Sequence, residues 1–155
     1  MYKPITDNDV RNAIISEARA KVVASFPVYN IPKVYQDVIL EAFDSKEWDI
    51  MKMDGCTIVR DYWINKFSPS CTPHDFQFKT GRGGFISNFL MNETNKMYAF
   101  PGYISGFRLT MVTIGWWGVY KWFHLIKGNV QPITRKMQLA YDFTKKNGKF
   151  KAYKN

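Results

Sequence analysis

The sequence predicts a small, mostly α-helical domain that ends in a basic C-terminal tail. Apolar residues recur at helical spacing in several segments, and prolines and glycines separate these segments. Hydrophobic residues make up 46% and charged residues 23% of the chain, which is the balance of a globular protein and excludes a disordered one. The 155 residues fit one domain, long enough to bury a core without obligatory disulfides or metals.

The first expected element is a helix over about residues 7–26. Thr6 and Asp9 have the spacing of a capping box, in which each residue bonds the other's backbone N–H. Pro27 and Pro32 mark the boundary that follows. A second helix is expected from residue 33 or 34 to 43, since one face of it carries Val34, Val38, Ile39 and Ala42. These helices, within residues 1–50, form an N-terminal addition to the central part of the chain.

A short β-hairpin is expected next. Met51, Lys52 and Met53 alternate as in a strand, Asp54-Gly55 is a turn signal, and residues 56–59 read as a second short strand.

Three helices are expected in the second half of the domain, over about residues 73–79, 85–98 and 103–127. Thr72 followed by Pro73 predicts the first start, because proline at the first helical position lacks an N–H that would stay unpaired. Residues 81–84, Gly-Arg-Gly-Gly, read as an ordinary turn or as a phosphate-binding loop that includes Arg82. A last helix is expected to run to about residue 146.

The chain carries a net charge of +9, and residues 131–155 supply most of it. This segment holds seven lysines and arginines against one acid, Asp142. A surplus of this size favours anionic partners such as nucleic acid, an anionic membrane surface or an acidic protein. Beyond Arg82, the candidate binding residues are Lys145, Lys146, Lys149 and Lys151.

No transmembrane span is expected. Arg108 and Lys121 interrupt the most apolar segment, residues 103–126, whereas a span needs about 20 predominantly apolar residues. No signal peptide is expected either, because the first residues are polar and no apolar region follows them. Cys56 and Cys71 are interpreted as free buried thiols, with one disulfide between them as the alternative.

The segment Cys71-Thr72-Pro73-His74-Asp75 carries the clearest chemistry. His74 can serve as a general base on a water molecule, since histidine titrates near neutrality. Asp75 can hold a hard cation such as calcium, with help from oxygens of the Asp54-Gly55 turn. The structural alternatives are a buried hydrogen-bonding role for His74 and helix capping by Asp75 at the third helical position.

Cys-x-x-His-Asp at a helix start resembles the signature of phospholipase A2-like domains, and the wider order resembles small phage and prophage proteins of that kind. The resemblance covers residues 54–128, and the matching stretches are 54–57, 61–63, 71–78, 86–90 and 103–128. It implies a helix pair with His74 as the base, Asp75 as a calcium ligand and a glycerophospholipid ester as substrate.

Two positions differ from the family pattern. Phe78 stands where the family has tyrosine, and Ser87 or Asn88 where it has the aspartate that orients the histidine. Without that carboxylate, a positively charged imidazole loses its stabilisation during catalysis. Asp54 and Asp61 are the candidates for a replacement, and Asp61 is the residue we single out.

We therefore expect a phage-encoded protein with a degenerate phospholipase A2-like site. Its role would be that of a structural or docking component in the neck, tail or capsid interior of a virion, or in the host cytoplasm. Its partners would be other virion proteins or further copies of itself. The alternatives are an active calcium-dependent phospholipase that acts on membranes and a basic nucleic-acid-binding protein packaged in the virion.

Overall fold

A computed structural model of the chain describes residues 6–53, 67–98 and 130–148. Helices hold 73% of these residues and no strand occurs among them, which confirms the mostly α-helical prediction. The helices within these ranges are α1 Asp7–Val28, α2 Lys33–Asp44, the 3-10 helix η1 Ile50–Lys52, α3 Cys71–Lys79, α4 Phe85–Met97 and α7 Arg135–Asn147. The predicted helix over 103–127 lies outside the described residues.

Helix α1 begins and ends with local hydrogen bonds. The predicted capping box is confirmed, since Thr6 Oγ1 accepts from the Asp9 N–H at 3.2 Å and Asp9 Oδ2 accepts from the Thr6 N–H at 3.0 Å. At the other end, Asn30 adopts a left-handed φ of 52°, which lets the Ile31 N–H bond the Phe26 carbonyl at 3.0 Å. This turn directs the chain into α2.

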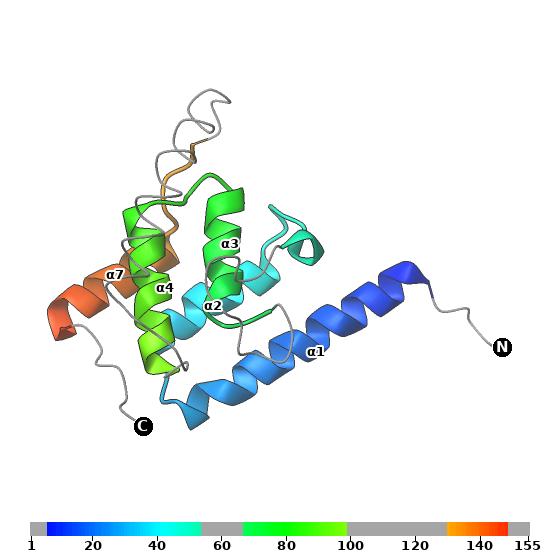
Figure 1. Cartoon of the computed structure of the whole chain (residues 1–155), viewed down its shortest axis with the longest axis horizontal. Coiled ribbons are helices and arrows are strands. Elements are labelled where there is room, and N and C mark those ends of the chain that lie inside the picture. The colour runs from blue at the N-terminus through cyan, green and yellow to red at the C-terminus, as the bar shows by residue number, and fades with distance from the viewer. Residues whose placement is uncertain (1–5, 54–66, 99–129, 149–155) are drawn as a thin grey trace.

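Helix α2 lies at the centre of the described core. Its buried face carries Tyr35, Val38, Ile39, Ala42 and Phe43, and it contacts α1, α3 and α7. In Figure 1, α3 and α4 stand side by side and α2 crosses behind them, while the first half of α1 extends away from the other helices.

The expected hairpin is wrong at its first strand. Residues Ile50–Lys52 form a single 3-10 turn, because Asp49 caps it by accepting from the Met51 N–H at 3.1 Å. Just before this turn, the Trp48 indole donates to the Ala42 carbonyl at 2.8 Å, which holds the connection against the end of α2. The second expected strand, residues 56–59, lies outside the described residues.

The turn between α3 and α4 is a Schellman motif, which fixes how the two helices meet. Gly81 adopts a left-handed φ of 82°, its N–H bonds the Phe78 carbonyl at 3.3 Å, and the Arg82 N–H bonds the Gln77 carbonyl at 2.7 Å. The predicted start of α3 is wrong by two residues. The helix begins at Cys71, where Ser68 Oγ accepts from the Cys71 N–H at 3.0 Å, so Thr72 is not the cap.

Helix α4 is buried on nearly all sides, and many of its buried side chains are polar. Glu93 is fully buried and accepts from Lys96 Nζ at 2.9 Å, and Thr94 donates to the Leu90 carbonyl at 2.7 Å. The other buried polar residues of this helix are Ser87, Asn88, Asn92 and Asn95. The interior around α4 therefore differs from the apolar core around α2.

Helix α7 packs on α2 and α4. The buried Tyr35 hydroxyl lies 2.5 Å from Thr144 Oγ1, which itself donates to the Ala140 carbonyl. The ring of Phe89 meets the ring of Tyr141 edge to face, with 5.2 Å between centroids. Within the described ranges, no helix combines the length and apolar character needed to cross a bilayer.

Candidate functional site

The helix pair places His74 of α3 opposite Asn88 of α4. His74 Nε2 lies 2.8 Å from Asn88 Oδ1. Because an amide oxygen can only accept a hydrogen bond, Nε2 carries the proton and Nδ1 keeps its lone pair. The second nitrogen of the ring thus has the protonation state that a general base needs.

His74 is partly buried, and the loss of hydration keeps it neutral. Loss of hydration lowers the pKa of its imidazole to about 4, and the hydrogen bond to Asn88 opposes that shift only in part. At neutral pH, the imidazole is therefore uncharged and a weak proton acceptor. The amide of Asn88 orients the ring but brings no net charge to it.

The ring of His74 packs against Phe78, one turn later on α3. The two ring centroids are 4.5 Å apart. Gly83 lies in the turn before α4 and approaches Phe78 closely. A Cβ at Gly83 would lie 2.5 Å from the phenyl ring. The phenyl ring of Phe78 therefore joins His74 to the α3–α4 turn.

Asp75 is partly buried and lies four residues after the first residue of α3. Because α3 begins at Cys71, Asp75 is past the third helical position, and the capping interpretation of Asp75 is wrong. The other predicted calcium ligands, Asp54 and Gly55, lie outside the described residues, as does Asp61. Within the described ranges, no three His, Cys, Asp or Glu side chains form a group that could hold a metal ion.

Cys71 is disulfide-bonded and buried at the start of α3, so its interpretation as a free thiol is wrong. The only other cysteine of the sequence, Cys56, lies outside the described residues. The disulfide anchors the first turn of the helix that carries His74.

The candidate binding residues fall into two groups. Arg82 points back into the molecule, where its guanidinium bonds both carboxylate oxygens of Glu47 at 2.6 and 3.3 Å and lies 5.9 Å from the Phe76 ring centroid. Lys145 and Lys146 are exposed on α7, and Lys145 Nζ lies 5.4 Å from the ring centroid of Tyr141. Lys149 and Lys151 lie outside the described residues.

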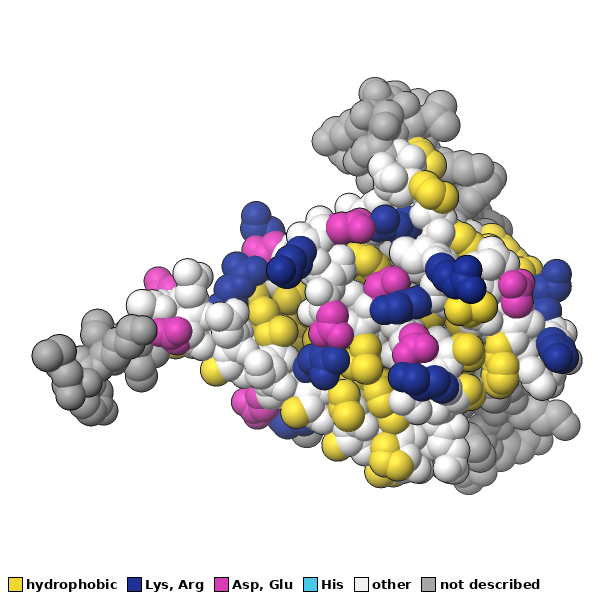
Figure 2. All heavy atoms as spheres, turned by 180° about the vertical axis from the view of Figure 1, so that it is seen from behind, with side chains coloured by type: hydrophobic (Ala, Val, Ile, Leu, Met, Phe, Trp, Pro, Cys, Tyr) yellow, Lys and Arg dark blue, Asp and Glu magenta, His cyan; other side chains and the backbone are white. Residues whose placement is uncertain are grey.

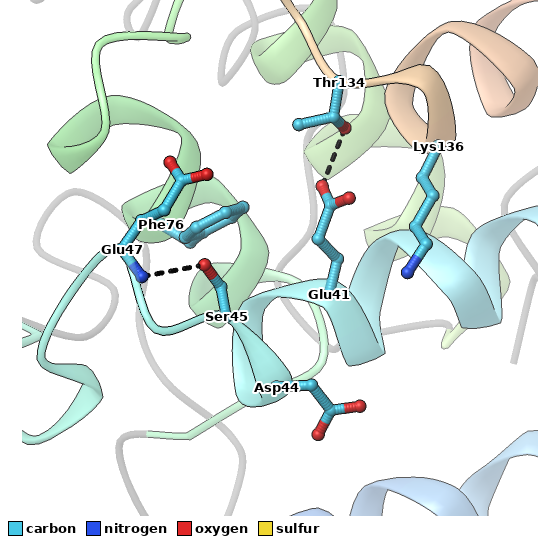
Figure 3. A pocket seen from close by; sticks show the side chains of 7 residues that line it. All are labelled: Glu41, Asp44, Ser45, Glu47, Phe76, Thr134 and Lys136. Atoms are coloured by element: carbon cyan, nitrogen blue, oxygen red, sulfur yellow. Dashed lines mark hydrogen bonds between the residues drawn. The ribbon is translucent and has the colours of Figure 1, made fainter.

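Sequence reasoning did not find a small pocket between the end of α2 and the start of α7 (Figure 3). It has a volume of about 240 Å³ and is lined by Glu41, Asp44, Ser45, Glu47, Phe76, Thr134 and Lys136. Each of its carboxylates already has a partner within the protein: Thr134 for Glu41, Arg19 for Asp44 and Arg82 for Glu47. These carboxylates therefore make structural contacts. Sequence reasoning missed the pocket because no sequence motif links the acids of α2 with Glu47 in the segment that follows it.

Comparisons with protein-family models, with curated proteins and with solved structures find no match to this chain.

Proposed function

We propose that this chain is a phospholipase A2-like protein whose catalytic site has lost its carboxylate, and that it serves as a structural or docking component of a virus particle. The observation that carries the proposal is the hydrogen bond from His74 to the amide of Asn88. The sequence resemblance supplies the family and the viral setting.

The amide matters because of what happens to the base during the reaction. A histidine that takes a proton from water becomes an imidazolium, and a carboxylate partner stabilises that charge. An amide keeps the tautomer but leaves the charge uncompensated, and burial already lowers the pKa of His74 to about 4. Proton transfer to His74 is therefore disfavoured at neutral pH.

An active esterase is the second candidate, and one observation favours it. His74 is neutral and carries its proton on Nε2, so Nδ1 is in the form that could accept a proton from water. A native enzyme of this kind would need a carboxylate near His74 from outside the described residues.

The docking role draws support from α7. Four exposed basic residues lie on this helix, two in its first turn and two in its last: Arg135, Lys136, Lys145 and Lys146. They give α7 a basic surface that attracts acidic protein or nucleic acid. The salt dependence of binding would distinguish a nucleic-acid partner.

Fatty-acid release from anionic phospholipid vesicles tests the proposal. The native protein, His74→Ala and Asn88→Asp are compared with calcium and with a chelator. We expect native release at the level of His74→Ala, and calcium-dependent release by Asn88→Asp that a second substitution, His74→Ala, abolishes.

Calcium-dependent release by the native protein that His74→Ala abolishes would overturn the proposal and establish the esterase. If Asn88→Asp is folded by circular dichroism but inactive, the missing carboxylate is not what silences the site, and the decayed-site explanation is wrong.

A further inference from the structure

The sequence contains one asparagine that is followed by glycine, Asn147-Gly148 at the end of α7. Because glycine has no Cβ, it hinders least the approach of its own backbone nitrogen to the amide of the preceding asparagine. Both residues are exposed. The three asparagines of α4, by contrast, are buried. Asn147 therefore combines an exposed amide with the least hindered neighbour that an asparagine can have.

The end of α7 is loosely closed. The N–H of the residue that follows α1, α2, α3 or α4 bonds a carbonyl of the last helical turn, whereas the described residues provide no such bond for Gly148. Gly148 adopts a left-handed φ of 80°, and a Cβ built on it would meet nothing within 4 Å. Among the described residues, the Gly148 N–H is thus unpaired and the space beside its Cα is open.

One exposed hydrogen bond holds the side chain of Asn147. Its Nδ2 donates to the Phe143 carbonyl, one turn earlier on α7, at 2.9 Å. Helix ends fray, and a rotation of Asn147 that brings its Cγ to the Gly148 nitrogen breaks this bond and displaces exposed residues alone. The reactive geometry therefore needs only the last residue of the helix to unwind.

We propose that Asn147 is a site of spontaneous deamidation, in which the Gly148 backbone nitrogen attacks the side-chain amide. The nitrogen gives its proton to hydroxide and forms a bond to Cγ of Asn147. The bond between Cγ and Nδ2 then breaks, and the amide nitrogen takes up a proton and leaves as ammonia. Water opens the resulting succinimide at either carbonyl. The products are aspartate, and isoaspartate, in which the chain continues through the side-chain carboxyl.

Either product places a negative charge at the end of a basic helix. The last turn of α7 carries Lys145 and Lys146, and Figure 2 shows basic side chains at the right-hand edge of the described body, where this helix ends. The new carboxylate also meets the negative end of the helix dipole. The reaction is independent of the proposed function, since it uses no residue of the His74 site.

Incubation of the full native chain at neutral and mildly alkaline pH tests the proposal. Mass spectrometry of proteolytic peptides follows each asparagine amide, and enzymatic methylation detects isoaspartate. We expect Asn147 to convert within about tenfold of its rate in a synthetic peptide of residues 143–151, because a fraying helix end opens at little cost in free energy. Both products should form, and faster at the higher pH, since the attacking nitrogen must lose its proton. Cation-exchange chromatography should show a less basic species near the position of Asn147→Asp.

Asn12 is the internal control, because it is exposed like Asn147 but lies inside α1 and precedes alanine. Its amide should stay intact over the same period. Gly148→Ala should slow the conversion of Asn147 at least about tenfold in the protein and in the peptide, since the added methyl group hinders the attack.

An intact Asn147 in the folded chain, at a time when the peptide has fully converted, would overturn the proposal. So would conversion without isoaspartate, or conversion at the native rate in Gly148→Ala, since either result would exclude attack by the Gly148 nitrogen.

Discussion

Glu41 of α2 and Thr134 at the start of α7 are joined by a 2.7 Å hydrogen bond across 93 residues of sequence (Figure 3). The same Thr134 hydroxyl accepts from the Met137 N–H at 3.3 Å and so caps α7. The first turn of α7 holds no acid of its own. Glu41 therefore brings a negative charge from another helix to the positive end of the α7 dipole.

Thr134→Val should destabilise the domain by about 1–2 kcal/mol, because it removes both the cap of α7 and the hydroxyl that bonds Glu41. The midpoint of urea unfolding measures this change. Thr134→Ser keeps the hydroxyl and should unfold close to the native midpoint. A loss in Thr134→Ser without a loss in Thr134→Val would mean that the methyl group, rather than the hydroxyl, holds the helix start.

Gly83→Ala should destabilise the domain by about 1–3 kcal/mol, because its Cβ would lie 2.5 Å from the Phe78 ring. Gly84→Ala is the matched control, since nothing lies within 4 Å of a Cβ at that position. Thermal unfolding compares the two variants. The His74 ring signals in an NMR spectrum should also shift in Gly83→Ala only, as Phe78 packs on that ring; unshifted signals would contradict the coupling.

Stability should fall as the pH is lowered from about 6.5 towards 4. The pKa of His74 is about 4 in the folded protein and near 6.5 when unfolded, so the unfolded chain binds the extra proton in this window. The free energy of unfolding should decrease by up to about 1.4 kcal/mol per pH unit, and level off above 6.5. Urea titrations at several pH values measure the slope.

His74→Gln should remove this part of the pH dependence. The carboxyls of Asp9 and Glu47, whose pKa values are lowered by hydrogen bonds from Thr6 and Arg82, add their own losses at lower pH in both proteins. Identical slopes for the native protein and His74→Gln between pH 6.5 and 4 would contradict a partly buried imidazole that stays neutral in the folded protein.

Tyr35→Phe should cost about 1 kcal/mol of stability, because it removes a fully buried hydroxyl that bonds Thr144 on α7. Burial should also keep the Tyr35 hydroxyl from ionising, since it raises the pKa of the phenol well above its usual value, and the bond to Thr144 opposes that shift only in part. Ultraviolet titration of the native protein and Tyr35→Phe should therefore coincide below pH 12. An additional phenolate signal in the native protein would show that Tyr35 is open to solvent.

Features set by neighbouring residues were predictable from the sequence. Thr6 and Asp9 are three residues apart, and a capping box needs nothing further than that spacing. The Gly81–Gly84 stretch likewise predicted a tight reversal, because a Schellman motif requires a left-handed residue after the last helical turn.

Two local predictions were wrong because a nearby side-chain oxygen accepts a backbone N–H and so sets a different backbone conformation. Thr72 before Pro73 has the pattern of a helix start, but Ser68 offers its hydroxyl to the Cys71 N–H and starts the helix earlier. Met51 and Met53 alternate with Lys52 as in a strand, but Asp49 caps a 3-10 turn at the same place. In both cases, a side-chain oxygen just upstream decides the backbone conformation.

The candidate site was predictable only as far as its helix pair. Asn88 and Ser87 were both candidates for the position opposite His74. Side chains of successive helical residues point about 100° apart, so only one of the two can face His74. The packing of α3 on α4 selects Asn88. The bonds from Arg82 to Glu47 and from Thr134 to Glu41 join distant segments. No spacing rule relates these residues, because their proximity comes from the tertiary fold.

The polar interior around α4 affects how precisely the helix is positioned in the fold. A purely apolar helix can slide by a turn or rotate and still fill its groove with similar contacts. Buried Asn88 allows no such freedom, since a displacement of α4 would carry its amide away from His74 on α3. This hydrogen bond therefore favours one rotation and one position of α4 relative to α3.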